Sequence, residues 1–109
     1  MMKKGEIWIV NIPQLDGREQ EGIRPAIVLV DTKTPVAIII PCTSNLQALR
    51  FPHTLLIEPS QENGLDATSI VLLFQIRAVD KKRLIKRIGV LDKSMMRQIN
   101  NLLKRLLSL

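Results

Sequence analysis

The chain has 109 residues, of which 46% are hydrophobic, and a formal net charge of +6. This composition excludes disorder and supplies the core of one domain, which we expect over residues 1–109. The one cysteine, Cys42, rules out an intrachain disulfide. No apolar run reaches the roughly 20 residues of a membrane-spanning helix or has the form of a secretory signal. The sequence therefore predicts a soluble, cytoplasmic protein without a membrane segment.

The basic residues gather in the last third of the chain. From Arg77 onward, ten lysines and arginines stand against two aspartates, a net charge of +8. Residues 1–76 carry six basic and eight acidic groups, a net charge of −2. Such a segment suits a nucleic acid or an acidic protein partner, and it is equally compatible with a solvated surface.

Short apolar and β-branched runs between turn residues predict strands in the first part of the chain. The first is Glu6–Ile12, followed by a polar loop with two glycines at Gln14–Ile23. Later strands are expected at Pro25–Val30, Val36–Ile40, Thr54–Ile57, Ser69–Val79 and Arg83–Ile88. The wholly apolar second strand is expected to be buried on both sides.

The chain is expected to end in an amphipathic helix. Asp92 can cap it, because an aspartate side chain accepts from backbone N–H groups of the first turn. One apolar stripe at helical spacing comprises Met95, Ile99, Leu102, Leu103 and Leu106. The fold class is therefore mainly β with a C-terminal α-helix, as a small antiparallel barrel or curled sheet. No βαβ alternation is present, which excludes a Rossmann-type fold.

Few residue types remain for chemistry. His53, the only histidine, excludes a two-histidine ribonuclease mechanism and is expected on an exposed loop. One cysteine and one histidine eleven residues apart do not make a zinc site. Neither a nucleophile elbow nor a phosphate-binding glycine loop is present. We therefore expect no metal or nucleotide cofactor, and a site made of arginine, hydroxyl, carboxylate and amide groups.

Arg24 and Thr43 are the leading candidates for such a site. Pro25 disfavours a helical conformation at Arg24 and holds it extended beside a buried strand. A guanidinium there can bind phosphate and stabilise a phosphorane-like transition state, or it can form a salt bridge to Glu19 or Glu21. The Thr43 hydroxyl can donate to a phosphate oxygen, or it can serve a turn. Cys42 is expected to pack as a small apolar side chain.

Several segments, taken in order, carry a resemblance to one family. They are Lys4–Trp8, Glu19–Leu29, Ile40–Ser44, Gly64–Leu65, Ser69–Leu72, Gln75–Asp80, Arg83–Leu84 and Ile88–Leu91. Each is weak alone, but the ordered set is specific and covers nearly the whole chain. The sequence resembles the MazF/PemK (Kid) family of toxin endoribonucleases, also called mRNA interferases.

This resemblance implies the toxin of a type II toxin–antitoxin system, a small SH3-like barrel of the MazF/CcdB type that works as a homodimer. It implies sequence-specific, metal-independent cleavage of single-stranded RNA (mRNA). The 2′-OH of the RNA would attack, leaving a 2′,3′-cyclic phosphate and a 5′-hydroxyl. It also implies a cognate antitoxin whose acidic C-terminal tail occupies the RNA groove.

The resemblance also assigns roles to residues of this chain. Arg24 would stabilise transition-state charge or deliver a proton to the leaving oxygen, and its high pKa makes it a poor general base. Thr43 would orient or neutralise the scissile phosphate, and Glu19 would accept the 2′-OH proton or read a base. The expected RNA contacts are Gln20, Ser44, Ser69 and Gln75. Ser69 and Gln75 are equally compatible with hydrogen bonds that pin a strand.

Two other functions are compatible with this fold class. A CcdB-like gyrase poison needs no active site, and the paired segments around Arg24 and Thr43 argue against it. A non-catalytic reader of single strands needs aromatic stacking platforms. The chain offers only Trp8, Phe51 and Phe74, and both Trp8 and Phe74 are predicted to be buried in apolar strands.

Overall fold

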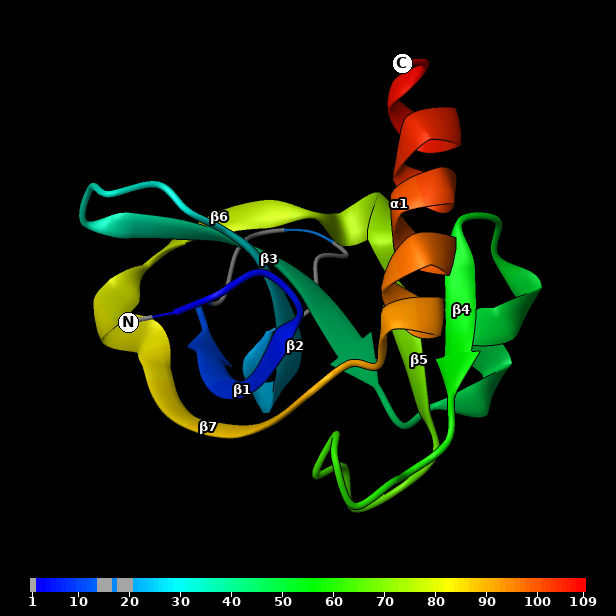
Figure 1. Cartoon of the computed structure of the whole chain (residues 1–109), viewed down its shortest axis with the longest axis horizontal. Helices are drawn as coiled ribbons and strands as arrows, with labels where there is room; N and C mark the ends of the chain where they lie inside the picture. Colours follow the sequence, from blue (N-terminus) through cyan, green and yellow to red (C-terminus); the bar gives the residue numbers. More distant parts are fainter. Residues whose placement is uncertain (1, 14–16, 18–20) are drawn as a thin grey trace.

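The computed structural model describes residues 2–13, 17 and 21–109 (Figure 1). The strands in these residues are β1 (Glu6–Ile12), β2 (Gly22–Asp31), β3 (Val36–Thr43), β4 (Thr54–Ile57), β5 (Ser69–Leu72), β6 (Arg77–Asp80) and β7 (Leu84–Val90). The helices are three short 3₁₀ helices, η1 (Leu46–Arg50), η2 (Leu73–Gln75) and η3 (Lys81–Arg83), and the terminal α1 (Lys93–Leu107). None of the helices in this part of the chain is long and apolar enough to cross a bilayer.

Three strands are longer than the sequence predicts, and one of them, β7, ends at Val90 instead of the expected Ile88. β2 begins at Gly22, because Gly22 and Ile23 pair with the end of β1, so the predicted loop is shorter on this side. β3 continues to Thr43, which pairs with Ile70 of β5. Arg24 and Thr43 therefore lie within paired strands rather than in flanking loops, which fixes their backbone positions more firmly than expected.

The prediction of one strand over Ser69–Val79 is wrong. Both halves of this segment pair with β3, but with different parts of it. β5 pairs with Cys42 and Thr43 at the end of β3, and β6 pairs with Val36–Ile39 at its start. The register differs by three residues between the two halves, and η2 takes up the extra residues. Pro41 lies in β3 between the two paired stretches, and a proline has no N–H to offer a ladder. The pairing breaks at this point.

The sheet is antiparallel throughout and strongly curled. Its strand order is β4-β5-β3-β2-β1-β7, with β6 added to the first half of β3. Among the described residues no pairing closes this path, so the sheet is open rather than a hydrogen-bonded barrel. Figure 1 shows β1, β2, β3 and β7 wrapped around one another, while β4 and β5 lie beside α1. The predicted class, mainly β with a C-terminal helix, is confirmed.

The core has two main parts. One lies inside the curl of β1, β2 and β3 and includes Val10, Val28 and Ile39, all fully buried. The other lies between the sheet and α1 and includes Ile7, Ile40 and Ile99. Alternate residues of β1 therefore face the two parts, and the second face is only partly covered, because Ile9 is half-exposed and Asn11 is exposed.

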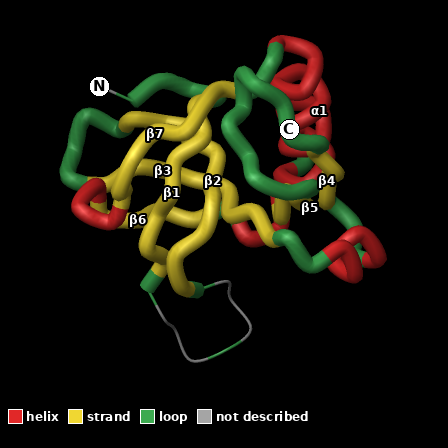
Figure 2. The backbone as a smooth tube through the Cα atoms, turned by 90° about the horizontal axis from the view of Figure 1, so that it is seen from below, coloured by secondary structure: helices red, strands yellow, loops and turns green. Residues whose placement is uncertain are grey.

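The helix α1 forms as predicted. The Asp92 carboxylate accepts from the Met95 backbone N–H at 2.7 Å and caps its first turn. The predicted stripe of apolar side chains packs against the core beside the sheet, and Ile99 at its centre is fully buried. Figure 2 shows α1 on the side of the molecule that carries β4 and β5. The helix therefore covers that end of the sheet and leaves the β1–β2–β7 end uncovered.

A buried carboxylate joins β1 to β7. Glu6 accepts hydrogen bonds from the Trp8 indole at 3.0 Å and the Lys3 backbone N–H at 3.1 Å. The Arg87 guanidinium donates to its other oxygen at 3.1 Å. Burial raises the pKa of Glu6, but these donors and the Arg87 charge outweigh it and hold the pKa below its ordinary value.

Candidate active site

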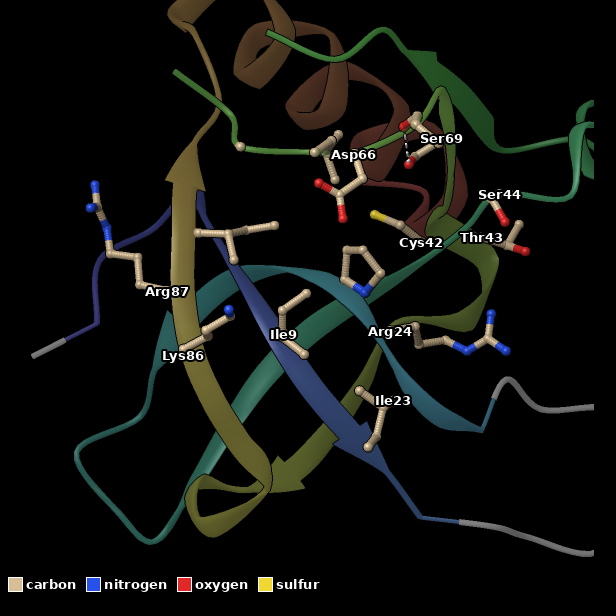
Figure 3. A pocket seen from close by; sticks show the side chains of 15 residues that line it. Ile9, Ile23, Arg24, Cys42, Thr43, Ser44, Asp66, Ser69, Lys86 and Arg87 are labelled. Atoms are coloured by element: carbon tan, nitrogen blue, oxygen red, sulfur yellow. Dashed lines mark hydrogen bonds between the residues drawn. The ribbon is translucent and has the colours of Figure 1, made fainter. Parts of the chain in front are cut away.

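A hollow of about 770 Å³ opens at the uncovered end of the sheet (Figure 3). Strands β2, β3, β5 and β7 and the loop before β5 supply its walls. Four of the sequence-predicted site residues line it, and these are Arg24, Thr43, Ser44 and Ser69. The fold therefore brings together side chains from three strands and one turn that are up to 45 residues apart in the chain.

Arg24 is half-buried and extended, as Pro25 predicts. Its Nε donates to the backbone carbonyl of Glu21 at 2.7 Å, so the stem is held by a main-chain acceptor. The alternative considered from the sequence was a salt bridge from Arg24 to a glutamate carboxylate. The partner in this hydrogen bond is the Glu21 backbone carbonyl and not its carboxylate. In Figure 3 the guanidinium lies on the same side of the hollow as Thr43 and Ser44. The guanidinium and the two hydroxyl-bearing residues therefore line the same hollow.

Thr43 serves a turn and also faces the hollow. Its Oγ1 accepts from the Asn45 backbone N–H at 3.2 Å, so the turn role considered from the sequence is real. A hydroxyl that accepts one bond still has its own hydrogen to donate. The side chain is 8% exposed, which keeps that hydrogen in a partly desolvated position where a bond to an anion is strong.

The other predicted contacts divide into three groups. Ser44 is exposed at the rim of the hollow. Ser69 is buried and donates to the Ala67 carbonyl at 2.9 Å, which is the local bracing role considered for it. Gln75 lies in η2 rather than on a strand, and it is not among the residues that line the hollow. Glu19 and Gln20 lie outside the described residues.

Several residues of the hollow were not singled out from the sequence. Lys86 on β7 adds a cation to the wall opposite Arg24, and Asp66 adds a carboxylate from the loop before β5. The Arg87 backbone also lines the hollow, but its guanidinium points away from it and is paired with Glu6. The concentration of charge in the last third of the chain is the sequence signal for the Lys86 cation, but it does not say which of the ten basic residues face the site. Asp66 has no such signal, since it sits in a turn-rich polar segment.

Cys42 contributes only packing to the hollow. The side chain is 1% exposed, and burial raises the pKa of its thiol to about 12. A thiol with this pKa stays protonated at neutral pH, and the thiolate is the nucleophilic form. Cys42 is thus the small apolar side chain that the sequence predicts, and the nucleophile must come from elsewhere.

The far wall of the hollow depends on two glycines. Gly64 has a positive φ of 67°, and a Cβ there would lie 2.0 Å from the Ile88 carbonyl oxygen. A Cβ on Gly89 would lie 2.3 Å from the carbonyl carbon of Asn63. Only glycine fits where these backbones approach so closely. The contact holds the loop before β5 against β7, which places Asp66 beside the hollow.

Asn63 braces the same loop from within. Its side-chain oxygen accepts from the backbone N–H groups of Ser60 at 2.9 Å and Leu65 at 3.0 Å. Its amide nitrogen donates to the Glu58 carbonyl at 3.0 Å.

Among the described residues no three histidine, cysteine or acidic side chains gather as metal ligands. The lining of the hollow, with Arg24, Lys86 and the hydroxyls of Thr43 and Ser44, offers groups that can bind an anion.

Comparison with known proteins decides which anion-binding family this is. The PemK-like, MazF-like toxins of type II toxin–antitoxin systems match residues 3–107. The chain belongs to this family. Endoribonuclease MazF of Staphylococcus saprophyticus is 31% identical over 105 residues, covering 93% of this chain and 87% of that protein. Endoribonuclease EndoA of Bacillus subtilis is 31% identical over 113 residues, covering 100% of this chain and 97% of that protein.

Solved structures agree on the fold of this PemK/MazF-like toxin. Crystalline MazF from Deinococcus radiodurans superposes with a TM-score of 0.82 at 23% identity, covering 99% of this chain and 97% of that one. A mycobacterial endoribonuclease in complex with its cognate antitoxin superposes with a TM-score of 0.75 at 19% identity, covering 100% and 97%. The family predicted from the sequence is confirmed, and the relatives' names agree with the predicted endoribonuclease class.

Proposed function

We propose that the chain is the toxin of a type II pair and cleaves single-stranded RNA by attack of the RNA's own 2′-OH. The observation that carries this proposal is the meeting of Arg24 and Thr43, from neighbouring strands, in one hollow with a cationic opposite wall. Family membership and the names of the relatives support the RNA substrate. The cytoplasm, where mRNA is available, is the proposed site of action.

The reaction needs an anion-binding site and a proton acceptor. The 2′-oxygen forms a bond to phosphorus while the bond from phosphorus to the 5′-oxygen breaks, giving a 2′,3′-cyclic phosphate. The 2′-OH proton passes to a carboxylate, and the departing 5′-oxygen takes a proton from the Arg24 guanidinium or from solvent water to become a 5′-hydroxyl. Exchange with solvent then restores the starting protonation of both side chains. Arg24 stabilises the added negative charge on the phosphoryl oxygens, and Thr43 donates to one of them. Because the substrate supplies the nucleophile, the mechanism needs no metal-bound water.

The assigned carboxylate is Glu19, with Asp66 as a second candidate. Glu19 comes from the family resemblance, and Asp66 is a carboxylate that lines the hollow. We further propose that Gln20, Ser44, Ser69 and Gln75 contact the RNA. Ser44 fits this role best by position, because it is exposed at the rim beside Thr43.

Two partners complete the proposal. An antitoxin with an acidic C-terminal tail would occupy the cationic hollow, by the same charge complementarity that suits RNA. A homodimer is the proposed working form. Relatives of similar fold have been solved in complex with an antitoxin, which supports the first of these proposals.

The test is cleavage of a long transcript in EDTA, with cut sites mapped by primer extension. We expect discrete cuts with the wild type, and Arg24→Ala or Thr43→Ala should lose about 10²–10³ in rate while staying folded. Matched controls are Arg97→Ala on the exposed face of α1 and Thr34→Ala in the β2–β3 turn, which should cleave normally. Intact RNA across varied sequences, with inhibition of gyrase supercoiling instead, would favour the CcdB-like alternative.

A further inference from the structure

A second, smaller hollow of about 110 Å³ adjoins the first one. It is formed by η1, η2 and the ends of β3 and β5, and Thr43 lines both hollows. A molecule bound at Thr43 in the larger hollow can therefore extend into the smaller one without leaving the protein surface. The occupant of the smaller hollow is then expected to be part of the same ligand.

Exposed aromatic rings form the wall of this smaller hollow. Phe51 is 45% exposed and Phe74 is 39% exposed, and their ring centroids lie 5.8 Å apart with planes inclined at 62°. The sequence prediction that Phe74 is buried in a strand is wrong, because η2 interrupts that strand and turns the ring outward. Because both rings remain in contact with water, they contribute less to the free energy of folding than fully buried phenylalanines would.

A guanidinium completes the aromatic pair. The Arg50 guanidinium lies over the Phe51 ring, with its central carbon 4.9 Å from the ring centroid. Arginine planes and aromatic rings are the two kinds of side-chain surface on which unpaired RNA bases stack. We call Arg50, Phe51 and Phe74 the aromatic site.

The aromatic site is held in place before any ligand arrives. The Phe51 carbonyl accepts from the Thr54 hydroxyl at 2.9 Å, and its N–H donates to the Ala48 carbonyl at 3.1 Å. The carbonyl of His53, whose φ is 59°, accepts from the Leu73 N–H at 3.0 Å and ties η2 to the segment after η1. These bonds hold the backbone that carries the rings, which reduces the conformational freedom lost when a base stacks on them.

Amide side chains lie beside the rings. Asn45 and Gln47 line the same hollow, and Asn45 caps η1 by accepting from the Gln47 backbone N–H. Side-chain amides offer donors and acceptors that match the edges of bases. The combination of rings, a guanidinium and amides suits a nucleobase better than it suits an aliphatic side chain.

We propose that the aromatic site stacks an unpaired base of the RNA substrate, from a nucleotide adjacent to the scissile phosphate. This inference rests on the proposed endoribonuclease function and adds a subsite to it. The base would enter the smaller hollow while the phosphate stays at Thr43. Stacking tolerates any base, so the rings supply affinity and position, and Asn45 and Gln47 supply the discrimination.

Binding of an uncleavable RNA tests the proposal separately from catalysis. The ligand is an oligonucleotide that spans the mapped cut site, with a 2′-deoxy nucleotide in place of the attacking 2′-OH. We expect Phe51→Leu and Phe74→Leu to weaken its binding roughly 5- to 150-fold, the usual contribution of one stacked base. Phe74→Tyr should bind like the wild type. Leu46→Ala is the matched control, because Leu46 is a 53% exposed side chain on η1 that does not line the hollow.

A base-specific readout identifies the stacked nucleotide. With 2-aminopurine at each position next to the cut site in turn, one position should lose fluorescence on binding to the wild type and keep it with Phe74→Leu. An abasic residue at that position should remove the difference between wild type and variant. Unchanged affinity and fluorescence in both phenylalanine variants would overturn the proposal and leave the endoribonuclease function standing.

Two further results would also overturn it. If the wild type neither binds nor cuts any RNA, the proposed function fails and this subsite fails with it. If Phe51→Leu or Phe74→Leu changes the mass in sedimentation relative to the wild type, the aromatic site is covered by a second copy of the chain. Stacking would then be the wrong assignment for these rings.

Discussion

The Thr43 hydroxyl shows how one residue can have a structural and a chemical use together. Its oxygen accepts from the Asn45 N–H, which holds the side chain in one rotamer and leaves its hydrogen free to donate. Such a hydroxyl is pre-organised, because the protein has already ordered it before the phosphate arrives. The sequence presents the turn role and the phosphate role as alternatives, and the geometry makes them compatible.

Cys42, next to Thr43, gives a prediction about pH. The pKa of its thiol is raised from 9.0 to about 12 in the folded chain. The unfolded chain therefore loses this proton first, and the stability that the thiol contributes at neutral pH is lost as the pH rises from 9.0 toward 12. The slope from this group is at most about 1.4 kcal/mol per pH unit.

The comparison is denaturant unfolding of wild type and Cys42→Ala between neutral and alkaline pH. Other groups titrate equally in both proteins, so the difference between the two curves isolates the thiol. Equal slopes for the two proteins would show that the thiol ionises as easily in the folded state. Cleavage by Cys42→Ala should remain, because the proposed mechanism uses no protein nucleophile.

The identity of the proton acceptor gives a second prediction at this scale. Glu19→Gln should lower the cleavage rate by about 10²–10⁴ and remove the acid limb of the pH–rate profile, as loss of a general base does. Asp66→Asn is the matched variant, because it removes the same charge from a carboxylate that lines the hollow, and it should keep that limb. If Asp66→Asn removed the acid limb and Glu19→Gln kept it, Asp66 would be the general base.

At the scale of elements, the periodicity of the sequence predicts most strands because each is short, apolar and bounded by turn residues. β1 and β4 have the predicted bounds, and the Asp92 cap and apolar stripe predict α1. The failures share one cause. The predicted strand over Ser69–Val79 is divided at η2 because of Pro41, a residue some thirty positions away in the chain. A local sequence pattern does not reveal which strands will pair with each other.

The candidate site was predictable to a similar degree. Arg24 and Thr43 come from ordered motifs that resemble a known family, and no single motif assigns them. Lys86 and Asp66 reach the hollow only through tertiary pairing, and the outward turn of Phe74 follows from the same break at η2. What the sequence could not provide is the set of neighbours, since these depend on register.

The glycine contact between the loop before β5 and β7 gives a prediction of stability. Gly89→Ala should destabilise the fold by about 3 kcal/mol or more, because the new Cβ would meet backbone atoms that cannot move aside. Gly22→Ala is the informative comparison. Its φ of 89° is strained for alanine, but among the described residues, apart from Gly22 and its two chain neighbours, no heavy atom lies within 4 Å of the added Cβ.

For Gly22→Ala we therefore expect only the backbone strain, about 1–2 kcal/mol. Midpoints of urea unfolding measure both variants against the wild type. Similar losses would mean that the loop before β5 shifts to make room, and that the close approach of Gly89 is not essential. In that event cleavage by Gly89→Ala should also be normal.

At the scale of the whole molecule, charge and shape act together. The sheet leaves its β1–β2–β7 end uncovered by α1, and that end carries the hollow with Arg24 and Lys86. Cations around a concave surface focus their potential and attract a polyanion over a distance. Part of the net charge of +6 therefore lies at the hollow, where it can act on a bound polyanion.

RNA binding should therefore depend steeply on salt. Each phosphate neutralised on a single strand contributes about −0.7 to the slope of log K against log salt. Lys86→Gln should make the slope shallower by about that amount, because Lys86 lines the hollow. Lys93→Gln, at the exposed start of α1, should leave the slope unchanged. An equal change of the salt slope in the two variants would show that the position of a positive charge on the protein does not matter for RNA binding.

The central position of β3 has a consequence for how the protein opens. This strand pairs with β2, β5 and β6, and its last residue is Thr43. Its amide protons can reach solvent only when several strands separate together, so hydrogen exchange at Ile38–Ile40 should require complete unfolding. Local fraying at the chain ends would leave Thr43 in place. We therefore expect cleavage activity to persist up to the global unfolding transition and to vanish with it in a single step.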